Sequence, residues 1–341
     1  MGDRCIVPDS TVMDQSLFDS EPVPKLAVVI ATRDGFGTIR RTVEHLRAQT
    51  VRREMELLIV APNRELLGLD PQAVDGFARC QVVEVGTIDQ IGAANAAGIR
   101  SASAPVVVLA EDHCFPEPDW AGQLIEAHQQ DWAAVGPAIR NANPATTVSW
   151  ADLFIGYGPW LEPVPSGEAD FLPGHNSSYK RHLLLPYGDR LATLLAAETV
   201  LHWDLRAKGF RLFLEPRARV AHTNFSRWSS WIPVQYLCGR SFAGTRAVDM
   251  SALRRAVYAV GSPAIPLVRL ARLARGIKAS GLRRRFLKTL PATAVGLIVD
   301  GIGQFVGYLA GPGSAPSALA RYEFRRIDHI TAEDRRTVFG Q

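Results

Sequence analysis

The sequence predicts an α/β protein with a mixed, mostly parallel sheet and flanking helices, because strand-like and helix-like segments alternate along its first third. Four segments have the length of strands: residues 26–32, which form a continuous apolar run, and residues 55–62, 80–86 and 105–111. Between these segments, residues 38–50 carry apolar side chains at helical spacing, and residues 88–102 are rich in small side chains. This order implies right-handed crossovers with helices on both faces, and a ligand site beyond the carboxyl ends of the strands.

The middle of the chain predicts further elements at less regular spacing. We expect a helix over residues 119–130, a strand over 132–139, a loop and short helix over 170–188, a helix over 191–209 and a pair of strands over 210–224. Gly209 is the expected C-cap of the long helix, and His222 lies at the end of the second strand of the pair.

Composition is typical of a folded protein with free thiols. The chain has 341 residues, of which 47% are hydrophobic, so it can bury a substantial core as one large domain or two modest ones. Its four cysteines have neither zinc-ligand nor redox spacing, which favours a reducing compartment. The first 24 residues lack the apolar run of a signal peptide, and we expect them to be a poorly ordered leader.

The last part of the chain is basic and apolar. Residues 251–311 hold ten Lys and Arg against one acid, Asp300, although the whole chain carries 38 basic and 34 acidic residues. Within residues 266–290, arginines recur every three residues between Leu and Ala, a pattern that suits a basic amphipathic helix on an anionic lipid surface. Nucleic acid is therefore not the expected partner.

The apolar residues 291–311 are long enough to cross a bilayer. However, Asp300 and Gln304 share one helical face, and a charge at the centre of a lone span costs about 2.5–3.5 kcal/mol. We therefore favour a helix in the membrane interface over a clean span. A soluble helical hairpin, packed on the body or on a dimer partner, is the alternative.

A charged triplet, Glu111, Asp112 and His113, directly follows the apolar residues 106–110 of the fourth segment. Burying such a triplet in a core is costly, whereas a strand end that opens into a cation site favours it. Carboxylate and imidazole are ligands of Mg²⁺ or Mn²⁺, and the imidazole favours Mn²⁺. Taken alone, a solvated acidic turn would have the same composition.

Three motifs in this order resemble the inverting family 2 glycosyltransferases of membrane-associated bacterial type, which have the nucleotide-diphospho-sugar transferase fold called GT-A. Residues 25–50, "KLAVVIATRDGFGTIRRTVEHLRAQT", are similar to that family's first strand, nucleotide-binding turn and first helix. Residues 92–128 place "EDHCFPEPDW" at the family's Asp-x-Asp motif, and residues 197–224 resemble its acidic catalytic helix and histidine-ended strand. The resemblance covers roughly residues 25–225.

The resemblance implies a donor and metal site. Thr32 and Arg33 would contact the nucleotide, and Glu111 would lie near the ribose. His113 stands at the metal position of the Asp-x-Asp motif, and His222 matches a histidine near the diphosphate and metal. The expected nucleotide-sugar residues are Thr32, Arg33, Asp89, Asn95, Glu111 and Asp112, and the expected ligands of Mn²⁺ or Mg²⁺ are Asp112, His113 and His222.

The resemblance also implies a catalytic base and an acceptor side. Glu198 aligns with the family's base, and His175 and Asn176 match a loop on the acceptor side. The local sequence supports Glu198 as the base. Glu198 interrupts an apolar helix turn, and partial burial there would raise its pKa. A solvent-facing Glu is the alternative. The pattern of processive relatives, Gln-x-x-Arg-Trp, does not occur near Gln235, which favours transfer of a single sugar. The resemblance implies a hexosyltransferase that acts in polysaccharide biosynthesis.

Two departures keep other functions open. The second of the four strand-like segments ends in "VAPNRE" without the acids that bind the base, so Asp89 is the expected substitute, and His113 replaces the usual Asp. An inactive nucleotide-sugar-fold scaffold at the membrane therefore stays possible. A dinucleotide-dependent oxidoreductase is less well supported, because Arg40 stands where the third glycine of "RDGFGTIR" would belong.

These observations divide the chain into four parts: a leader over residues 1–24, a GT-A domain over 25–232, a helical membrane-associated region over 233–311 and a C-terminal tail over 312–341. The expected partners are a nucleotide-sugar donor, a lipid-linked or glycan acceptor and a membrane surface, with a homodimer left open. The expected location is the cytoplasmic face of the cell membrane.

Overall fold

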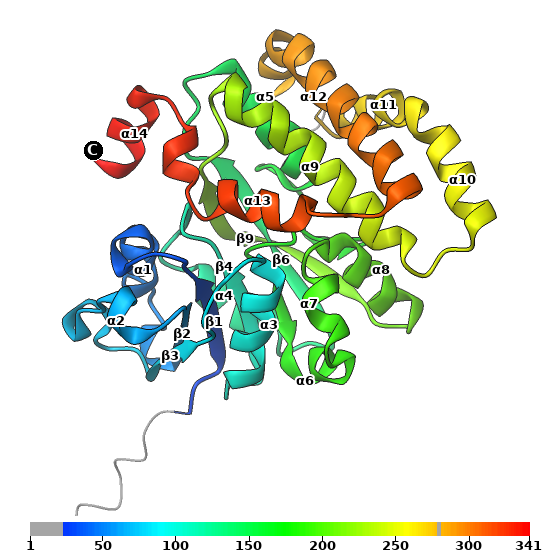
Figure 1. The fold of residues 1–341 in the computed structure, drawn as a ribbon. Helices are drawn as coiled ribbons and strands as arrows, with labels where there is room; N and C mark the ends of the chain where they lie inside the picture. Colours follow the sequence, from blue (N-terminus) through cyan, green and yellow to red (C-terminus); the bar gives the residue numbers. More distant parts are fainter. Residues whose placement is uncertain (1–22, 278–280) are drawn as a thin grey trace, which may run out of the picture.

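A computed structural model describes residues 23–277 and 281–341, so the expected leader lies almost entirely outside the described residues. A nine-stranded sheet runs through the lower half of the molecule in the order β3-β2-β1-β4-β8-β6-β9-β5, with β7 paired to β9 (Figure 1). The strands are β1 Leu26–Ala31, β2 Met55–Ala61, β3 Arg79–Glu84, β4 Val106–Ala110, β5 Cys114–Pro116, β6 Ala134–Asn141, β7 Gly167–Ala169, β8 Ser178–Lys180 and β9 Leu212–His222.

The first half of the sheet is parallel, as the sequence predicts. β1 pairs with β2 and β4, and β2 pairs with β3, all in parallel. The helices in this and the following part of the chain are α1 Arg40–Arg47, α2 Arg64–Leu67, α3 Ile91–Ser101, α4 Trp120–Ala127, α5 Thr147–Tyr157, α6 Arg181–Leu184, α7 Arg190–Leu194 and α8 Glu198–Ala207. Small residues let α3 lie close to the sheet, because a Cβ at Gly98 would stand 2.3 Å from Val29 Cγ1.

The second half of the sheet contains both parallel and antiparallel strand pairs, and one element predicted there is different in the structure. β8 is antiparallel to β4 and β6, whereas β6 and β9 are parallel. The pair of strands predicted over residues 210–224 is wrong, because β9 is one strand that follows β6 on both sides of a register shift near Pro137. β9 also pairs with β5, which sets Cys114 opposite His222.

The helix predicted over residues 191–209 is broken in the structure. α7 ends at Leu194, and Ala197 leaves the helical region with φ −154° and ψ 71° before α8 begins. The break places Glu198 in the first turn of α8 instead of mid-helix. Gly209 follows α8 with φ 88°, as expected of a residue that ends a helix in the left-handed conformation.

The helical region forms the upper half of the molecule (Figure 1). Its helices are α9 Trp228–Ala247, α10 Ala252–Gly261, α11 Ile265–Ile277 and α12 Arg283–Ala310. α9 and α12 cross at close range through glycines, since a Cβ at Gly303 would lie 2.2 Å from Tyr236 O. Asp300 and Gln304 are buried on the protein side of α12, and Asp300 Oδ2 accepts hydrogen bonds from Arg269 Nη1 and Gln304 Nε2, both at 2.7 Å.

The opposite face of α12 is apolar and exposed. Val295, Ile298, Ile302, Phe305 and Leu309 lie on it. Among the described residues, α12 is the one helix long and apolar enough to cross a membrane, and 56% of its apolar stretch is buried within the protein. The same length and composition occur in core helices of other proteins, so membrane contact stays a prediction.

The C-terminal segment folds back over the carboxyl ends of the strands. It consists of α13 Ala315–Glu323, a 3₁₀ turn η8 Arg326–His329 and α14 Ala332–Phe339. Figure 1 shows α13 crossing beneath α9 and α14 lying above α1. The Phe339 ring is 5.8 Å from the Phe115 ring, and Arg325 pairs with Asp34 at 3.1 Å. This segment therefore closes the edge of the sheet where a ligand is expected.

Candidate active site

Four side chains that can bind a metal meet where β4 ends. They are Glu111, His113, Cys114 and His222, all buried, and their ligand atoms all lie within 4.8 Å of one another. The turn after β4 supplies the first three residues, and the β5–β9 pairing brings His222 to them. The charged triplet and the strand-end histidine, more than 100 positions apart in the sequence, thus form one cluster.

Both histidines of this cluster are oriented in the manner of metal ligands. His113 Nδ1 lies 2.6 Å from Asp112 Oδ1, and His222 Nδ1 lies 2.9 Å from Asn224 Oδ1. Since these oxygens accept the Nδ1 protons, each Nε2 is left with a free lone pair. The two Nε2 atoms lie 3.5 and 3.9 Å from the Glu111 carboxylate, and His113 Nε2 has no hydrogen-bond partner. Histidine ligands are held by oxygen acceptors on Nδ1 in the same way.

The donor set fits a divalent transition metal such as Mn²⁺. Two imidazoles and one carboxylate converge, and imidazole is a poor partner for Mg²⁺. Glu111, predicted near the ribose, shares this cluster with His113. Asp112, predicted as a ligand, instead holds the His113 ring by its Nδ1. The ligand assignment itself stays a prediction.

The electrostatics of this cluster favour the binding of a cation. Burial alone would raise the pKa of Glu111, but the charge of the neighbouring His175 opposes burial most strongly, and that pKa lies below its usual range. Burial lowers the pKa of His222 well below its ordinary value. Glu111 is therefore a carboxylate and His222 a neutral imidazole, the two forms that bind metals.

Glu198 faces the metal cluster across His175. Its carboxyl is buried beside Gly174, where a Cβ would lie 2.6 Å from Glu198 Oε2. His175 Nε2 is 3.2 Å from Glu198 Oε1, and His175 Nδ1 is 3.6 Å from Glu111 Oε1. Asn176, in the left-handed region with φ 65°, donates Nδ2–H to Glu111 Oε2 at 3.3 Å. The loop predicted on the acceptor side thus joins the two carboxylates.

Burial and neighbouring charges shift the pKa values of His175 and Glu198. Burial would lower the pKa of His175, but Glu111 and Glu198 raise it to about 9, so its imidazole is protonated at neutral pH. The pKa of Glu198 is raised by burial, against the opposing effect of His175. A carboxylate with a raised pKa is a stronger base, which suits proton transfer from a hydroxyl.

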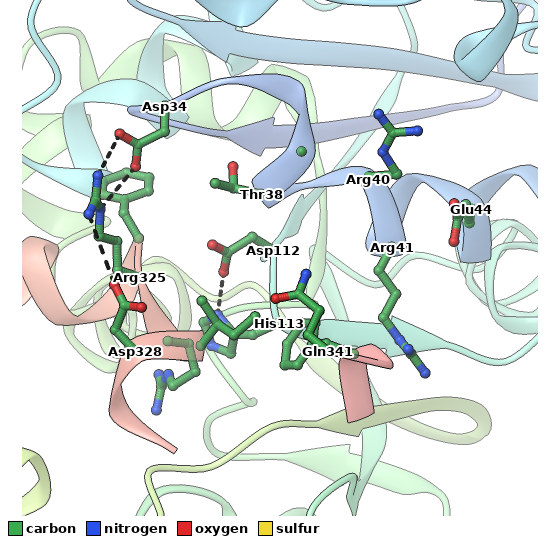
Figure 2. Close-up of a pocket in the computed structure, with 15 residues that line it drawn as sticks. Asp34, Thr38, Arg40, Arg41, Glu44, Asp112, His113, Arg325, Asp328 and Gln341 are labelled. Atoms are coloured by element: carbon green, nitrogen blue, oxygen red, sulfur yellow. Dashed lines mark hydrogen bonds and ion pairs between the residues drawn. The ribbon is translucent and has the colours of Figure 1, made fainter. Parts of the chain in front are cut away.

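Two cavities meet this cluster. The first, called here the tail cavity, has a volume of about 590 Å³ and lies between α1 and the C-terminal segment (Figure 2). Its lining includes Asp34, Arg41, Asp112, His113, Arg325 and Arg326. The second, called the apolar cavity, has a volume of about 670 Å³. It has Glu111, His175 and Glu198 at one end and reaches Tyr258, Ile265 and Val268 of α10 and α11.

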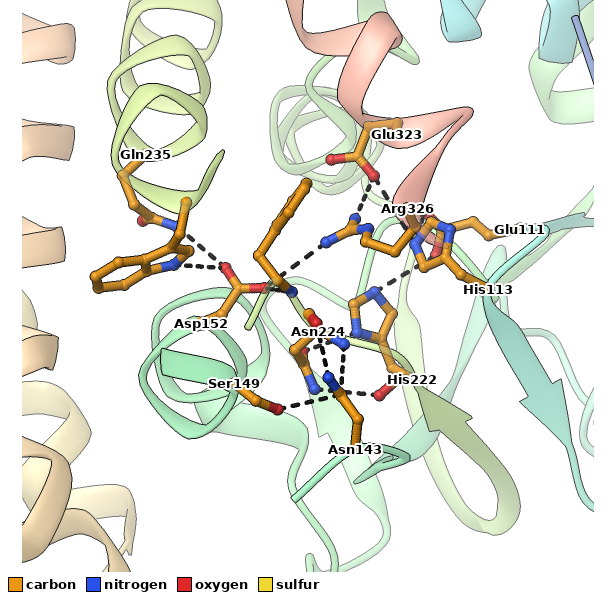
Figure 3. A network of polar contacts seen from close by, with 12 residues as sticks. Glu111, His113, Asn143, Ser149, Asp152, His222, Asn224, Gln235, Glu323 and Arg326 are labelled. Atoms are coloured by element: carbon orange, nitrogen blue, oxygen red, sulfur yellow. Dashed lines mark hydrogen bonds and ion pairs between the residues drawn. The ribbon is translucent and has the colours of Figure 1, made fainter. Parts of the chain in front are cut away.

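An ionic network that no sequence pattern indicates lies beside the cluster (Figure 3). Arg326 pairs with Glu323, and its Nη1 lies 3.7 Å from Asp152 Oδ2. Burial raises the pKa of Asp152 to about 6, although Arg326 opposes the shift. Glu323 Oε2 lies 3.8 Å from His113 Nε2. The tail carries a short charged run, "EFRRIDH", and no local pattern in it points to these contacts.

The other residues predicted to bind the nucleotide lie outside the linings of the two cavities. Thr32 is buried after β1, where its Oγ1 lies 2.8 Å from Thr38 Oγ1 and accepts the Asp34 N–H, so it shapes the turn. Asp89 is exposed, and Asn95 is buried within α3 with no hydrogen-bond partner for Nδ2. Thr32, Arg33, Asp89 and Asn95 line neither cavity, so their nucleotide contacts stay predictions.

Comparison with known proteins agrees with this geometry. No curated protein matches the chain significantly. A solved structure of the mannosyltransferase PcManGT from Pyrobaculum calidifontis, in complex with GDP-Man and Mn²⁺, is 15% identical with a TM-score of 0.50, covering 83% of this chain and 87% of that one. The structure of S. aureus TarS 1-349 in complex with UDP is 16% identical with a TM-score of 0.45, covering 84% and 91%.

At such identities a structural match shows the fold alone, and the PcManGT match shows the predicted α/β arrangement. The sequence comparison adds the family, since residues 27–187 match the family described as glycosyl transferase family 2. This range contains β1–β4, the charged triplet and the His175 loop. Residues 27–187 therefore match a glycosyl transferase family 2 domain, and the chain has the GT-A fold.

Proposed function

We propose that the protein is an inverting glycosyltransferase that moves a single hexose-type sugar from a nucleotide-diphospho-sugar to a hydroxyl of a lipid-linked or glycan acceptor. One observation carries this proposal: Glu198 and the metal cluster face the same cavity, bridged by His175 at 3.2 and 3.6 Å. A base and a leaving-group site on opposite sides of one space are what an in-line displacement requires.

The side chains divide the reaction between them. Glu198 accepts the proton of the acceptor hydroxyl while the oxygen attacks the anomeric carbon. The bond from this carbon to the β-phosphate oxygen breaks, and its electron pair leaves with the nucleoside diphosphate. Protonated His175 keeps the Glu198 carboxylate in place and balances its charge. A divalent cation held by Glu111, His113 and His222 would neutralise charge on the departing diphosphate.

The tail cavity is the proposed donor site. It begins at the turn after β1 and ends at Asp112 and His113, so a nucleotide there would present its diphosphate to the metal cluster. The PcManGT structure contains GDP-Man and Mn²⁺, and TarS structures contain UDP and UDP-GlcNAc. These neighbours support a nucleotide-sugar donor here, and the base and sugar are open.

The apolar cavity supports an acceptor with a hydrophobic part. From Glu198 it extends past Trp203 and Phe242 to Ile265 and Val268 at α11. Arg246, Arg269 and Arg272 also line it, so the cavity combines apolar walls with cations. A lipid carrying an anionic group has the matching chemistry.

The surface outside this cavity supports action at a membrane. Exposed apolar side chains on α10, α11 and α12 include Leu253, Val257, Val260, Leu267, Ile298 and Phe305. Exposed arginines of α10–α12, such as Arg254, Arg275 and Arg283, lie on the same helices. An apolar face flanked by basic residues favours an anionic interface, and we propose the cytoplasmic face of the cell membrane.

A donor screen tests the proposal. The protein is incubated with UDP- and GDP-sugars, Mn²⁺ and a membrane lipid extract, and release of nucleoside diphosphate is measured. The proposal predicts release that depends on one donor and on the extract, and a product of inverted anomeric configuration by NMR. A membrane scaffold would bind nucleotide without release, and that result would overturn the enzymatic proposal.

A further inference from the structure

We propose that Arg326 binds the β-phosphate of the donor, so that the C-terminal segment completes the leaving-group site. The inference rests on the proposed function, because it needs a nucleoside diphosphate in the tail cavity. Arg326 lies outside residues 27–187, so the family 2 domain does not supply it.

Arg326 is a buried cation with an unused donor. Its residue is 4% exposed, and its guanidinium lies 3.6 Å from the Phe225 ring centroid. Glu323 and Asp152 each pair with one end of the guanidinium, but Nε is buried with no hydrogen-bond partner. Buried N–H groups are nearly always paired in folded proteins, so the Nε of Arg326 is a donor that a ligand in the adjoining cavity can use.

The position of Arg326 matches that of a β-phosphate. Among the Arg and Lys residues that line the two cavities, Arg326 alone lines both of them. In the proposed reaction the β-phosphate lies at the same boundary, since it joins the nucleotide to the sugar that meets the acceptor. Arg325, the neighbouring cation, is more exposed and is already paired with Asp34 through two hydrogen bonds (Figure 2).

Charge balance explains why a cation is needed at this point. Asp152, Glu323 and Glu111 lie near Arg326 (Figure 3), and their negative charges would repel a diphosphate. Arg326 offsets two of these carboxylates directly. Its planar guanidinium also matches phosphate oxygens, because it offers parallel N–H donors in a fixed geometry.

Calorimetric titration with UDP, GDP, UMP and GMP in the presence of Mn²⁺ tests the inference without requiring turnover. Arg326→Met should weaken binding of the diphosphate that the wild type prefers by about tenfold to a hundredfold. Binding of the matching monophosphate should be unchanged, because it lacks the β-phosphate. Arg326→Lys should lose less, because it keeps the charge without the planar donors. Arg321→Met, an exposed change on helix α13 directly before the turn that carries Arg326, is the matched control and should bind like the wild type.

Thermal unfolding identifies variants that are folded. If Arg326→Met does not fold, Arg326→Lys decides, because it leaves Asp152 and Glu323 compensated. A folded variant that binds the diphosphate as tightly as the wild type would overturn the inference. An equal loss for diphosphate and monophosphate would also overturn it, since that indicates a general distortion of the site. Failure of the wild type to bind any diphosphate would instead remove the proposed donor site itself.

Discussion

The apolar cavity has buried carboxylates at both ends, and the two ends differ in how fully their polar atoms are paired. At the end formed by Glu111 and Glu198, His175 Nδ1 and the adjacent His113 Nε2 have no hydrogen-bond partner, and the partner of Glu198 Oε1 is His175, through an ion pair. Near α12, Asp300 Oδ2 is bonded by both Arg269 and Gln304. Buried polar groups are costly when unpaired, so an incomplete set is kept for a ligand and a complete set stabilises the fold.

The difference teaches that buried charge alone does not identify a site. Asp300 stood out in the sequence as a charge within an apolar run, just as Glu198 did. The structure gives Asp300 an arginine partner, and it gives Glu198 a cavity and a protonated histidine. The predictions below test these two ends separately.

The largest effect on ligand affinity is expected at the metal cluster. Asp112→Asn, which weakens the hold on His113, should lower Mn²⁺ affinity by about 10–100-fold, and His113→Ala should lower it further. Calorimetric titration of Mn²⁺ without nucleotide measures both. Asp119→Asn, an exposed change a few residues away, is the control. Unchanged affinity in both His113→Ala and His222→Ala would show that the cation binds elsewhere.

At the α12 end, overpacking should affect stability and not chemistry. Gly303→Val forces a side chain against Tyr236 O, where a Cβ would already lie 2.2 Å away, and should lower the free energy of unfolding by about 1–3 kcal/mol. Ile302→Val, on the exposed face of the same helix, should change it by less than about 0.5 kcal/mol. Chemical denaturation measures both, and equal stabilities would contradict the close crossing of α9 and α12.

Breaking the ion pair between Asp300 and Arg269 should lower the free energy of unfolding by less than overpacking at Gly303 does. Asp300→Asn removes the charge that Arg269 faces, and we expect a loss of about 1–2 kcal/mol, because the Arg269 side chain is 30% exposed and partly hydrated. A double-mutant cycle with Arg269→Met isolates the pair. A coupling energy near zero would show that the complete hydrogen-bond set at this end contributes nothing to stability.

A smaller effect is expected in the pH dependence of the rate. Because burial raises the pKa of Glu198, the base becomes protonated at a pH above the ordinary 4.5 of a glutamate. The rate should therefore fall, as the pH is lowered, through an apparent pKa above that value. A pH profile of nucleoside diphosphate release measures it, and an acid limb at or below pH 4.5 would contradict a buried base.

The fold was largely predictable, because its signals are local. The apolar runs of β1, β2 and β4 and the small residues of α3 are properties of short segments. The broken helix before Glu198 was not, since apolar spacing continues through Leu195 and tertiary contacts set the conformation of Ala197. The single long strand β9 depends on pairing with β6, which a sequence does not display.

The candidate site was predictable in part. The resemblance pointed to His113, Glu198 and His222, and the structure places Glu198 and His222 on the apolar cavity and His113 on the tail cavity. It did not indicate Arg326, which meets Asp152 across more than 170 positions of sequence. Contacts of this kind arise when a terminal segment packs against the sheet edge, and no motif within the tail records them.

The most direct test of the central claim is the turnover of Glu198→Gln, with Glu333→Gln on the exposed surface of α14 as the control. If Glu198 is the base, the variant should lose about 10²–10⁴-fold in kcat while its Kd for the nucleoside diphosphate stays the same. Turnover equal to that of the wild type, in a variant that is folded and binds nucleotide, would contradict the account.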